Sequence, residues 1–416
     1  MRIIYIHQYF TTPDMVGGTR SFEFARRFVD WGHEVTVVSA WTHPVARQGW
    51  FETHETGARV LWYPVSYSNA MSFKQRLRAF GKFAAAARVR ASKTLADVVF
   101  ATSTPLTVSI PGVSAARSNR VPLVFEVRDL WPTVPIALGA LSNPAMRWAA
   151  TRMERWAYRN SEAVIALSPG IRDGIASTGY PRNRIAVIPN SCDIDAFTES
   201  DASREAFRQS RPWLGDRPLI VYAGALGRAN GVSDLIEIAS ELSDMVPEAR
   251  ILIIGDGSER DALRDLARSR RVLDRTLFME PAMPKKDVLA AFTAADLTMC
   301  LFVDVEALWT GSPNKLFDSL AAGTPVFINY GGWQADLLHK SGAGIVSVRE
   351  SAPSAAARIA DFLHDDDRRI VAGSRARSLA SEVFNRNDHA QQVMHVLQAA
   401  VDGQGQAASS VSPHWT

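Results

Sequence analysis

The chain has 416 residues, of which 47% are hydrophobic and 21% are charged, and its formal net charge is +3. The length exceeds what one hydrophobic core usually serves, so the composition predicts a globular protein of two or more domains. The small net charge argues against a nucleic acid partner, and the two widely spaced cysteines, Cys192 and Cys300, argue against a disulfide framework.

The chain begins directly in a strand-like apolar run, without the charged leader and cleavage site of a secretory signal. Its apolar runs fall well short of the roughly 20 residues that cross a bilayer. The histidines form no metal-ligand pattern, so we expect no bound metal. These features together predict a cytoplasmic protein.

In the first half of the chain, short apolar runs alternate with helical stretches. The runs lie at residues 3–6, 34–38, 98–101, 123–127, 163–167 and 184–188. Strands that are apolar throughout are typical of a parallel sheet covered on both faces by helices. We therefore predict a doubly wound α/β domain over residues 1–200.

Gly17 and Gly18 follow the first strand and open a helix. Without a Cβ atom, they allow backbone N–H groups to approach a phosphate or an acceptor closely, although a plain turn explains them equally well. The Gly-x-Gly-x-x-Gly fingerprint of dinucleotide enzymes is absent, which disfavours an NAD-dependent oxidoreductase.

Residues 72–93 carry seven cations and no acidic residue. Phe73, Leu77, Phe80 and Phe83 recur among them at helical spacing. This pattern predicts a helix with one face in a lipid interface and the other toward anionic headgroups. The alternative is a solvated basic helix that covers the sheet, and no recognised nucleic-acid motif accompanies the segment.

Arg128 and Asp129 stand where the strand over residues 123–127 ends. Charged residues at the carboxyl end of a central strand are costly unless they are paired or used in a site. We expect this pair to bind an acceptor and to deprotonate its hydroxyl group. The alternative is an interdomain ion pair.

A second series of apolar runs predicts a second α/β domain over residues 217–385. These runs lie at residues 219–223, 250–254, 277–279, 297–301, 326–328 and 344–348. Ligands bind at the carboxyl ends of the strands in such sheets, so we expect an interdomain active site. The Gly-, Ala-, Ser- and Gln-rich residues 403–416 predict a disordered tail.

Two loops of the second domain are rich in glycine. The loop after residue 223 contains Gly227, Arg228 and Asn230, and the guanidinium suits a diphosphate by charge and by geometry. The loop after residue 254 has the sequence Gly255-Asp256-Gly257 and is interpreted either as a donor-binding turn or as a simple helix cap.

The run Ser312-Pro-Asn314-Lys315-Leu316-Phe-Asp318 places a lysine and a carboxylate three residues apart at a predicted helix start. The free backbone N–H groups and the dipole of a helix N-terminus favour an anionic ligand there. We expect Lys315 to meet a phosphate and Asp318 a sugar hydroxyl. An ordinary surface helix is the alternative.

The order of these motifs over residues 1–400 resembles glycosyltransferase family 4, which has the two-domain GT-B fold. The run from Glu126 to Pro132 and the run from Ser312 to Asp318 are most similar to WbuB-like N-acetyl-L-fucosaminyl transferases of O-antigen and capsule synthesis. The resemblance implies a retaining mechanism, with the donor held mainly by the C-terminal domain. It also implies that a terminal helix, over residues 386–402, returns to the first domain.

The resemblance assigns Asp318 to the donor ribose, as the second acid of the family's Glu-x7-Glu motif. Thr310 stands where the first acid belongs. The cations that usually hold the diphosphate are replaced by Ala225 and Asn230. Arg228 and Lys315 are then the cations left for the diphosphate, and we assign both of them to catalysis.

In the acceptor domain, Arg128 and Asp129 stand in place of the family's His-Asp pair. We assign them to acceptor or catalytic contact and leave the general base open. The expected substrates are a UDP-sugar, with UDP-N-acetyl-L-fucosamine as the candidate donor, and a lipid-linked oligosaccharide at the inner face of the cytoplasmic membrane. No tightly bound cofactor is expected. Two alternatives stay open, a UDP-sugar 2-epimerase of the same fold and a non-catalytic nucleotide-sugar-binding protein.

Overall fold

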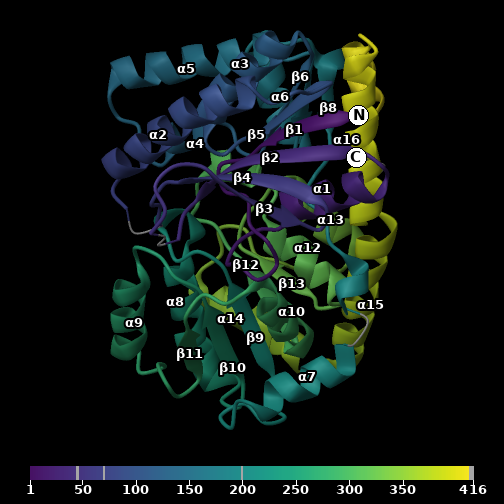
Figure 1. Ribbon diagram of the computed structural model, residues 1–416. Coiled ribbons are helices and arrows are strands. Elements are labelled where there is room, and N and C mark those ends of the chain that lie inside the picture. The colour runs from purple at the N-terminus through teal and green to yellow at the C-terminus, as the bar shows by residue number, and fades with distance from the viewer. Residues whose placement is uncertain (44–45, 69–70, 198–199, 412–416) are drawn as a thin grey trace.

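Two α/β domains are stacked one above the other in the computed structural model, which describes residues 1–43, 46–68, 71–197 and 200–411 (Figure 1). Each domain is built around its own sheet, with helices on both faces. The strands that the apolar runs predict are all present. The predicted architecture of two doubly wound domains is therefore confirmed.

The N-terminal sheet has eight strands in the order β3-β4-β2-β1-β5-β6-β7-β8. Its strands are β1 (Arg2–Ile6), β2 (Glu34–Trp41), β3 (Phe51–Glu55), β4 (Ala58–Pro64), β5 (Val98–Thr102), β6 (Leu123–Val127), β7 (Ala163–Ala166) and β8 (Ile185–Val187). All neighbours pair in parallel except β3, which is antiparallel to β4 at one edge. The central strands are buried on both faces, as the absence of alternation in their sequences predicts.

Two layers of helices enclose this sheet. The helices of the first domain are α1 (Arg20–Asp30), α2 (Phe73–Ser92), α3 (Ser109–Asn119), α4 (Thr133–Ala137), α5 (Pro144–Arg159) and α6 (Pro169–Ser177). The apolar side chains of α2, α3, α5 and α6 share one core with one face of the sheet, and those of α1 share another core with the opposite face.

The C-terminal sheet has six parallel strands in the order β11-β10-β9-β12-β13-β14. They are β9 (Leu219–Ala223), β10 (Arg250–Ile254), β11 (Leu277–Glu280), β12 (Leu297–Cys300), β13 (Val326–Ile328) and β14 (Gly344–Val346). The helices are α7 (Ser200–Gln209), α8 (Val232–Met245), α9 (Arg260–Ser269), α10 (Lys285–Ala294), α11 (Glu306–Trp309), α12 (Asn314–Ala321), α13 (Trp333–Ser341), α14 (Ala352–Leu363) and α15 (Asp366–Glu382).

The boundary between the domains lies earlier than the predicted start at residue 217. Helix α7 packs against α10, and its Phe207 belongs to the core of the second domain. The stretch after residue 199 is polar and of mixed charge, so the sequence predicts a linker there. The structure shows that the few apolar residues of this stretch form one face of α7 and pack against α10. The second domain therefore begins near residue 200.

Helix α16 (Arg386–Val401) crosses back to the first domain and packs against α1, β5, β6 and β7 (Figure 1). Its Val393 and Leu397 are fully buried in the core that α1 shares with the N-terminal sheet. Where the chain crosses, Asp193 accepts ion pairs from Arg27, at 2.7 Å, and from Arg386, at 3.3 Å. These ion pairs join α1 to the segment that leaves the first domain and to the start of the returning helix α16.

The prediction that residues 403–416 are disordered is wrong up to Val411. The short 3₁₀ helix η5 (Gly405–Ser410) lies against β8, Ala408 is buried, and the N–H of Val187 donates to the carbonyl of Val411 at 3.1 Å. Small residues indicate low complexity in the sequence, but here they permit close contact, since a Cβ on Gly405 would lie 2.5 Å from the carbonyl oxygen of Glu162. Residues 412–416 lie outside the described residues.

The prediction that the apolar face of residues 72–93 enters lipid is also wrong. Helix α2 begins with a capping box between Ser72 and Gln75. Its Phe83 is buried in the core that it shares with the sheet and α3, and its Phe80 is buried beside Tyr67. The side chain of Phe73 lies outside the described residues. The helical periodicity is correct, but the buried phenylalanines meet protein, and the exposed side chains include cations such as Lys82 together with Val89.

Candidate active site between the domains

A cavity of about 240 Å³ lies between the two domains and is lined by residues that the sequence assigns to acceptor and donor. The first domain contributes Arg128, Asp129 and Asn190, and the second contributes Ser312 and Asn314. The carboxyl end of β6 and the N-terminus of α12 thus face each other, as the strand order of two stacked parallel sheets dictates. The structure brings the predicted residues Arg128, Asp129, Ser312 and Asn314 to one cavity.

Direct contacts across the domain boundary fix the geometry of this cavity. The backbone N–H of Asn190 donates to Ser312 Oγ at 3.0 Å, and its side-chain amide donates to the Ser312 carbonyl. Ser168, which caps α6, donates through its hydroxyl to the carbonyl of Thr310 at 2.5 Å. Asn190 and Ser168 were missed by the sequence reasoning as site residues, although each follows a predicted strand on the edge that faces the cleft.

The glycine loop of the first domain also reaches the second domain. A Cβ on Gly18 would lie 2.5 Å from Asn314 Nδ2, so only glycine allows this approach. Gly17, with φ of +146°, packs on Thr11, whose hydroxyl donates to the carbonyl of Gly18 at 3.0 Å. Gly18 therefore lies at the start of the predicted donor helix, and Gly17 shapes the loop behind it.

Arg128 and Asp129 are held by their neighbours in the loop after β6. The backbone N–H of Arg128 donates to Ser103 Oγ at 3.0 Å, and Asp129 Oδ2 accepts from Thr104 Oγ1 at 3.2 Å. The Asp129 side chain is exposed to solvent in the cavity, and protein atoms of the cavity walls lie around it. Desolvation raises the pKa of its carboxyl group, while Arg128 and the Thr104 hydrogen bond oppose this shift.

His7, at the end of β1, adds a neutral group beside this pair. Its Nε2 lies 3.4 Å from Arg128 Nη1. Burial, followed by the nearby Arg128 cation, holds the pKa of His7 well below its usual value. The imidazole is therefore uncharged at neutral pH and can accept a hydrogen bond from Arg128.

Lys315 is the most unusual of the predicted donor residues, and it is not among the residues that line the interdomain cavity. Its ammonium nitrogen is buried 4.0 Å from the centre of the Tyr222 ring, and within the described parts of the chain it has no hydrogen-bond partner. A Cβ on Gly224 would lie 2.7 Å from this nitrogen, so glycine makes room for it at the carboxyl end of β9. A buried cation that touches only an aromatic face lacks the anion that would normally compensate its desolvation.

Asp318 does not reach the interdomain cavity. It is buried on α12 and forms an ion pair with Lys285 at the start of α10. Both residues line a second cavity of about 570 Å³, which also contacts Glu23 of α1. Lys285 was missed by the sequence reasoning, although the Lys285-Lys286 pair follows β11 on the edge where donor contacts were expected.

Four other predicted donor contacts have structural explanations. Leu316, which was assigned to donor binding, has a side chain fully buried in the core of the second domain, so only its backbone is left for the predicted contact. Gly255 and Gly257 are required by packing between loops, because a Cβ on either would lie 2.0 Å or 2.2 Å from the carbonyl oxygen of Gly224 or Leu226. Asp256 caps its own turn by accepting the N–H of Gly257 at 3.1 Å.

Arg228 is exposed at the start of the 3₁₀ turn η4 (Arg228–Asn230), and it does not line the interdomain cavity. The amide of Asn230 donates within the same turn to the carbonyl of Gly227 at 3.4 Å. The loop that contains Gly227, Arg228 and Asn230 is therefore organised by itself. Its role toward a ligand stays a prediction.

Beneath the site lies a buried ion pair that the sequence does not reveal. Arg20 of α1 donates to Glu126 at 2.8 Å and to the carbonyls of Pro189 and Ile188, and Glu126 also accepts the Thr102 hydroxyl at 2.7 Å. Arg20 and Glu126 are 1% and 0% exposed. This pair fixes α1 and its glycine loop to the carboxyl end of β6.

Two family models match consecutive parts of the chain. The Glycosyl transferase 4-like domain matches residues 17–191, and the Glycosyl transferases group 1 domain matches residues 203–379. The two matches together cover more than four fifths of the chain. The chain belongs to the glycosyltransferases. The cleft described above lies between the parts that match these two domains.

Individual relatives agree with this assignment. A GDP-mannose-dependent alpha-(1-6)-phosphatidylinositol monomannoside mannosyltransferase of Mycobacterium tuberculosis is 25% identical over 296 residues, which are 70% of this chain and 72% of the relative. HepE of Anabaena, solved with UDP and glucose, has a TM-score of 0.70 at 17% identity over 95% of this chain and 99% of that one. WaaG, a glycosyltransferase involved in lipopolysaccharide biosynthesis, has the same TM-score, identity and coverage. The likeness to HepE and WaaG shows that this glycosyltransferase has the GT-B fold.

Proposed function

We propose that this glycosyltransferase transfers a sugar from a UDP-sugar to a lipid-linked oligosaccharide, with retention of the anomeric configuration, in bacterial surface polysaccharide synthesis. The observation that carries the donor part is the buried Lys315 ammonium without a partner at the carboxyl end of β9. A diphosphate would supply the missing anion. No other ligand class matches a lone buried cation beside a helix N-terminus as well.

In this proposal, residues of the second domain bind most of the donor, and residues of the first domain bind the acceptor. Lys315, and Arg228 from the neighbouring loop, stabilise the departing diphosphate, which is expected to be the largest catalytic contribution. Ser312, Asn314 and Gly18 surround the sugar-phosphate. Asp318 binds the ribose hydroxyls, which requires its carboxylate to be shared with Lys285.

Arg128 and Asp129 form the acceptor half of the site. The guanidinium binds an acceptor oxygen, and the carboxylate accepts a hydrogen bond or the proton of the attacking hydroxyl. The raised pKa of Asp129 makes its carboxylate a better proton acceptor than an ordinary aspartate, since its charged form is partly desolvated.

The proposed acceptor class and pathway are supported by the similarity of this chain to two named glycosyltransferases. The mannosyltransferase relative is named for a phosphatidylinositol-linked acceptor, and WaaG is described as acting in lipopolysaccharide biosynthesis. The motif resemblance to N-acetyl-L-fucosaminyl transferases supports UDP-N-acetyl-L-fucosamine as the donor. We place the enzyme at the inner face of the cytoplasmic membrane as a peripheral protein.

Calorimetric titration with a panel of nucleotide sugars tests this proposal. UDP-sugars are expected to bind, and the panel must include GDP-mannose because the mannosyltransferase relative is named for it. Binding of GDP-mannose alone would overturn the assignment to UDP. The variant Lys315→Met should lose binding of UDP itself, because the diphosphate carries the proposed contact.

Turnover then separates the classes of function. A transferase consumes the bound donor only when an acceptor is present, whereas a 2-epimerase converts the donor alone. Conversion without an acceptor, followed by nuclear magnetic resonance of the sugar, would replace transfer with epimerisation. Binding without turnover, in the presence of lipid-linked acceptors from a surface polysaccharide pathway, would favour the non-catalytic alternative.

A further inference from the structure

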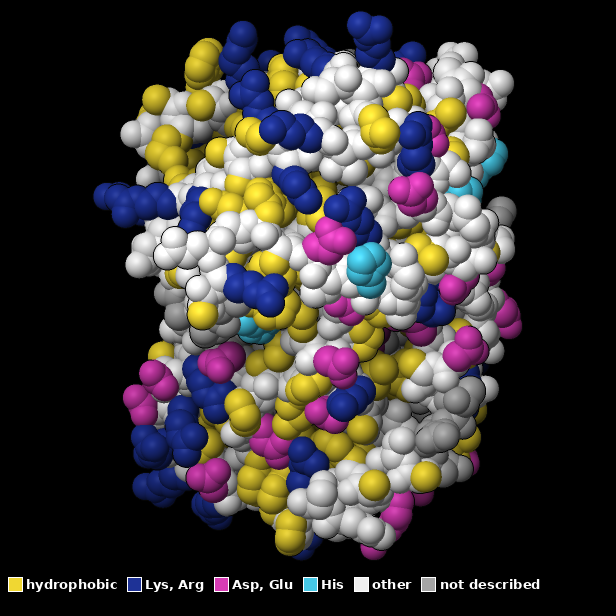
Figure 2. Space-filling model, in the orientation of Figure 1, with side chains coloured by type: hydrophobic (Ala, Val, Ile, Leu, Met, Phe, Trp, Pro, Cys, Tyr) yellow, Lys and Arg dark blue, Asp and Glu magenta, His cyan; other side chains and the backbone are white. Residues whose placement is uncertain are grey.

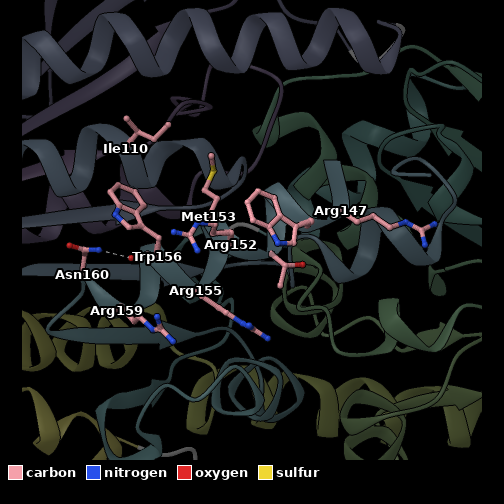
Figure 3. A pocket seen from close by; sticks show the side chains of 10 residues that line it. Ile110, Arg147, Arg152, Met153, Arg155, Trp156, Arg159 and Asn160 are labelled. Atoms are coloured by element: carbon pink, nitrogen blue, oxygen red, sulfur yellow. Dashed lines mark hydrogen bonds between the residues drawn. The ribbon is translucent and has the colours of Figure 1, made fainter. Parts of the chain in front are cut away.

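Helix α5 presents a groove that no part of the proposed reaction uses. The groove has a volume of about 700 Å³ and is formed by α5 together with Ile110 of α3 (Figure 3). Its lining from α5 consists of Arg147, Trp148, Thr151, Arg152, Met153, Arg155, Trp156, Arg159 and the adjacent Asn160. Four cations and four large apolar side chains line the groove, without an acidic one.

The N-terminal half of α5 projects from the domain. Asn143 caps the helix by accepting the N–H groups of Ala145 and Met146, and Pro144 occupies the first turn. Residues 142–149 are all exposed. Trp148 is 68% exposed, and Met146 is exposed as well. A tryptophan on a projecting helix turn is costly in water and is typical of a membrane interface.

The arginines of the groove lie along one strip of the helix. Trp148, Arg152, Arg155 and Arg159 follow one another at spacings of four, three and four residues, and Arg152 lies 5.8 Å from the centre of the Trp148 ring. In Figure 3, Met153 and Trp156 lie on the side of Ile110, while Arg155 and Arg159 reach in the other direction. Among the described residues, none of the four groove arginines forms an ion pair, so their charges are available to a ligand.

The acidic residue of α5 faces inward. Glu154 is buried and accepts the hydroxyl of Tyr158 at 3.2 Å. Burial raises the pKa of Glu154 to about 7, so its negative charge is incomplete at neutral pH. The outer face of α5 therefore carries positive charge and apolar surface together.

We propose that this α5 groove is a binding site for anionic phospholipid, through which the protein docks on a membrane surface. The arginines would bind headgroup phosphates, and Trp148 with Met146 would enter the interface. Charge complementarity selects an anionic lipid over a neutral one, and the exposed aromatic selects a lipid over a soluble anion. Within the described residues no helix is long and apolar enough to span a bilayer, so any membrane contact by these helices is made at the surface.

The surroundings of α5 support this location. Helix α3 lies between α5 and α2, and the exposed cations of α2 extend the same basic surface. Figure 2 shows Lys and Arg gathered with apolar side chains over the part of the first domain where Figure 1 has these helices. Helix α5 also follows α4, whose Val134 lines the interdomain cavity next to Asp129. Docking through α5 would hold the acceptor side of the cleft near the bilayer.

Vesicle flotation of the full-length protein tests the proposal. Wild-type protein is expected to bind phosphatidylcholine vesicles in which about a third of the lipid is phosphatidylglycerol, and not vesicles of phosphatidylcholine alone. The triple variant Arg152→Gln, Arg155→Gln, Arg159→Gln should lower partitioning about 100-fold, since each basic residue near an anionic surface contributes about fivefold. The matched control removes three exposed cations of α2, through Lys74→Gln, Arg78→Gln and Arg88→Gln.

A second pair of variants tests the contribution of the exposed Trp148 side chain to vesicle binding. Trp148→Ala should weaken vesicle binding about tenfold with an unchanged dependence on salt, because it removes interfacial burial and no charge. Trp31→Ala, which removes another exposed tryptophan, should have no effect. Circular dichroism and binding of UDP report folding for every variant, and neither readout requires lipid.

The outcomes are decisive in both directions. A loss in the α5 variants that exceeds the loss in the α2 control by about tenfold supports the groove. Equal losses of vesicle binding in the α5 and α2 variants would overturn the groove and indicate that the whole basic surface attracts the vesicle. Failure of the wild type to bind anionic vesicles would overturn the proposal and favour an acidic protein partner. Because donor binding is measured separately, failure of this inference leaves the proposed transfer reaction intact.

Discussion

The charged groups of Arg20 and Lys315 are both buried, but their surroundings are opposite. The guanidinium of Arg20 donates to a carboxylate and to two backbone carbonyls, so these acceptors inside the protein compensate for the loss of its hydration. The ammonium of Lys315 meets the face of Tyr222 and, among the described residues, no acceptor. Since desolvating a charge without a partner costs several kcal/mol, the first cation serves the fold and the second is expected to serve a ligand.

The strongest test of this comparison is removal of the compensated cation. Arg20→Met leaves the Glu126 carboxylate buried with only the Thr102 hydroxyl, so the free energy of unfolding should fall by about 3–5 kcal/mol. Urea denaturation followed by circular dichroism measures the loss. The double variant Arg20→Met, Glu126→Gln should recover part of it, because no unpaired charge remains. A single variant as stable as wild type would show that the pair is not structural.

Removal of the uncompensated cation should give the reverse pattern. Lys315→Met is expected to lower kcat about 10²- to 10³-fold, the usual effect of losing one preorganised group that stabilises developing charge. Its stability should stay equal or rise, because a desolvated ammonium is replaced by an apolar side chain. Steady-state kinetics and urea denaturation on the same preparation measure both effects.

The exposed Lys340→Met on α13 is the control for Lys315, since it removes the same charge away from the cleft. It should change neither kcat nor the denaturation midpoint. If Lys315→Met were as active as wild type, the diphosphate assignment would fail. If it were less stable, the ammonium would have a structural role like that of Arg20.

A third cation, Arg228, differs from both Arg20 and Lys315 because it is exposed to solvent, in the loop after β9. Arg228→Ala should lower turnover by about tenfold, since a solvent-exposed charge near the leaving group is screened more than a buried one. The effect should shrink as salt is raised, whereas the effect of Lys315→Met should persist. Kinetics at two ionic strengths separate the two, and a salt-independent loss for Arg228→Ala would place this side chain in a dry site.

The sequence predicts the architecture well because burial of parallel strands leaves a direct trace. The strand over residues 123–127 is apolar apart from Glu126, and that exception is the residue that pairs with Arg20. The edge hairpin of β3 and β4 was missed, because Phe51–Glu55 alternates with exposed residues and resembles a loop. Alternation of apolar runs with helical stretches predicts the parallel strands, but it does not predict strands added at the edge of the sheet.

The site was predicted less completely, for a different physical reason. Arg128, Asp129, Ser312 and Asn314 line the interdomain cavity, and each was predicted because it follows or precedes a predicted element at the edge of a sheet. The partners of Asp318 and Arg20 depend on long-range packing, which no local pattern records. Periodicity likewise predicts that α2 is amphipathic, but it does not say whether Phe83 meets lipid or protein.

The smallest expected effect concerns the acceptor half of the cleft, where charge and desolvation act together on Asp129. Desolvation raises the pKa of this carboxyl group, and the Arg128 cation lowers it. If ionised Asp129 is required for transfer, kcat/KM should fall as the pH drops through this pKa. Arg128→Gln removes the opposing cation, so the pKa should rise further and the acid limb of the profile should move to higher pH.

The variant Thr104→Val distinguishes titration of Asp129 from loss of acceptor binding. It removes the hydrogen bond that also lowers the pKa of Asp129 and leaves the Arg128 guanidinium in place. The acid limb should move in the same direction, with a smaller loss of kcat/KM at its plateau than Arg128→Gln shows. If the limb of both variants coincides with that of wild type, a group other than Asp129 controls it. In that case this aspartate belongs with Arg20, as a charge that organises the fold, and the acceptor half of the site must be sought elsewhere along the cavity.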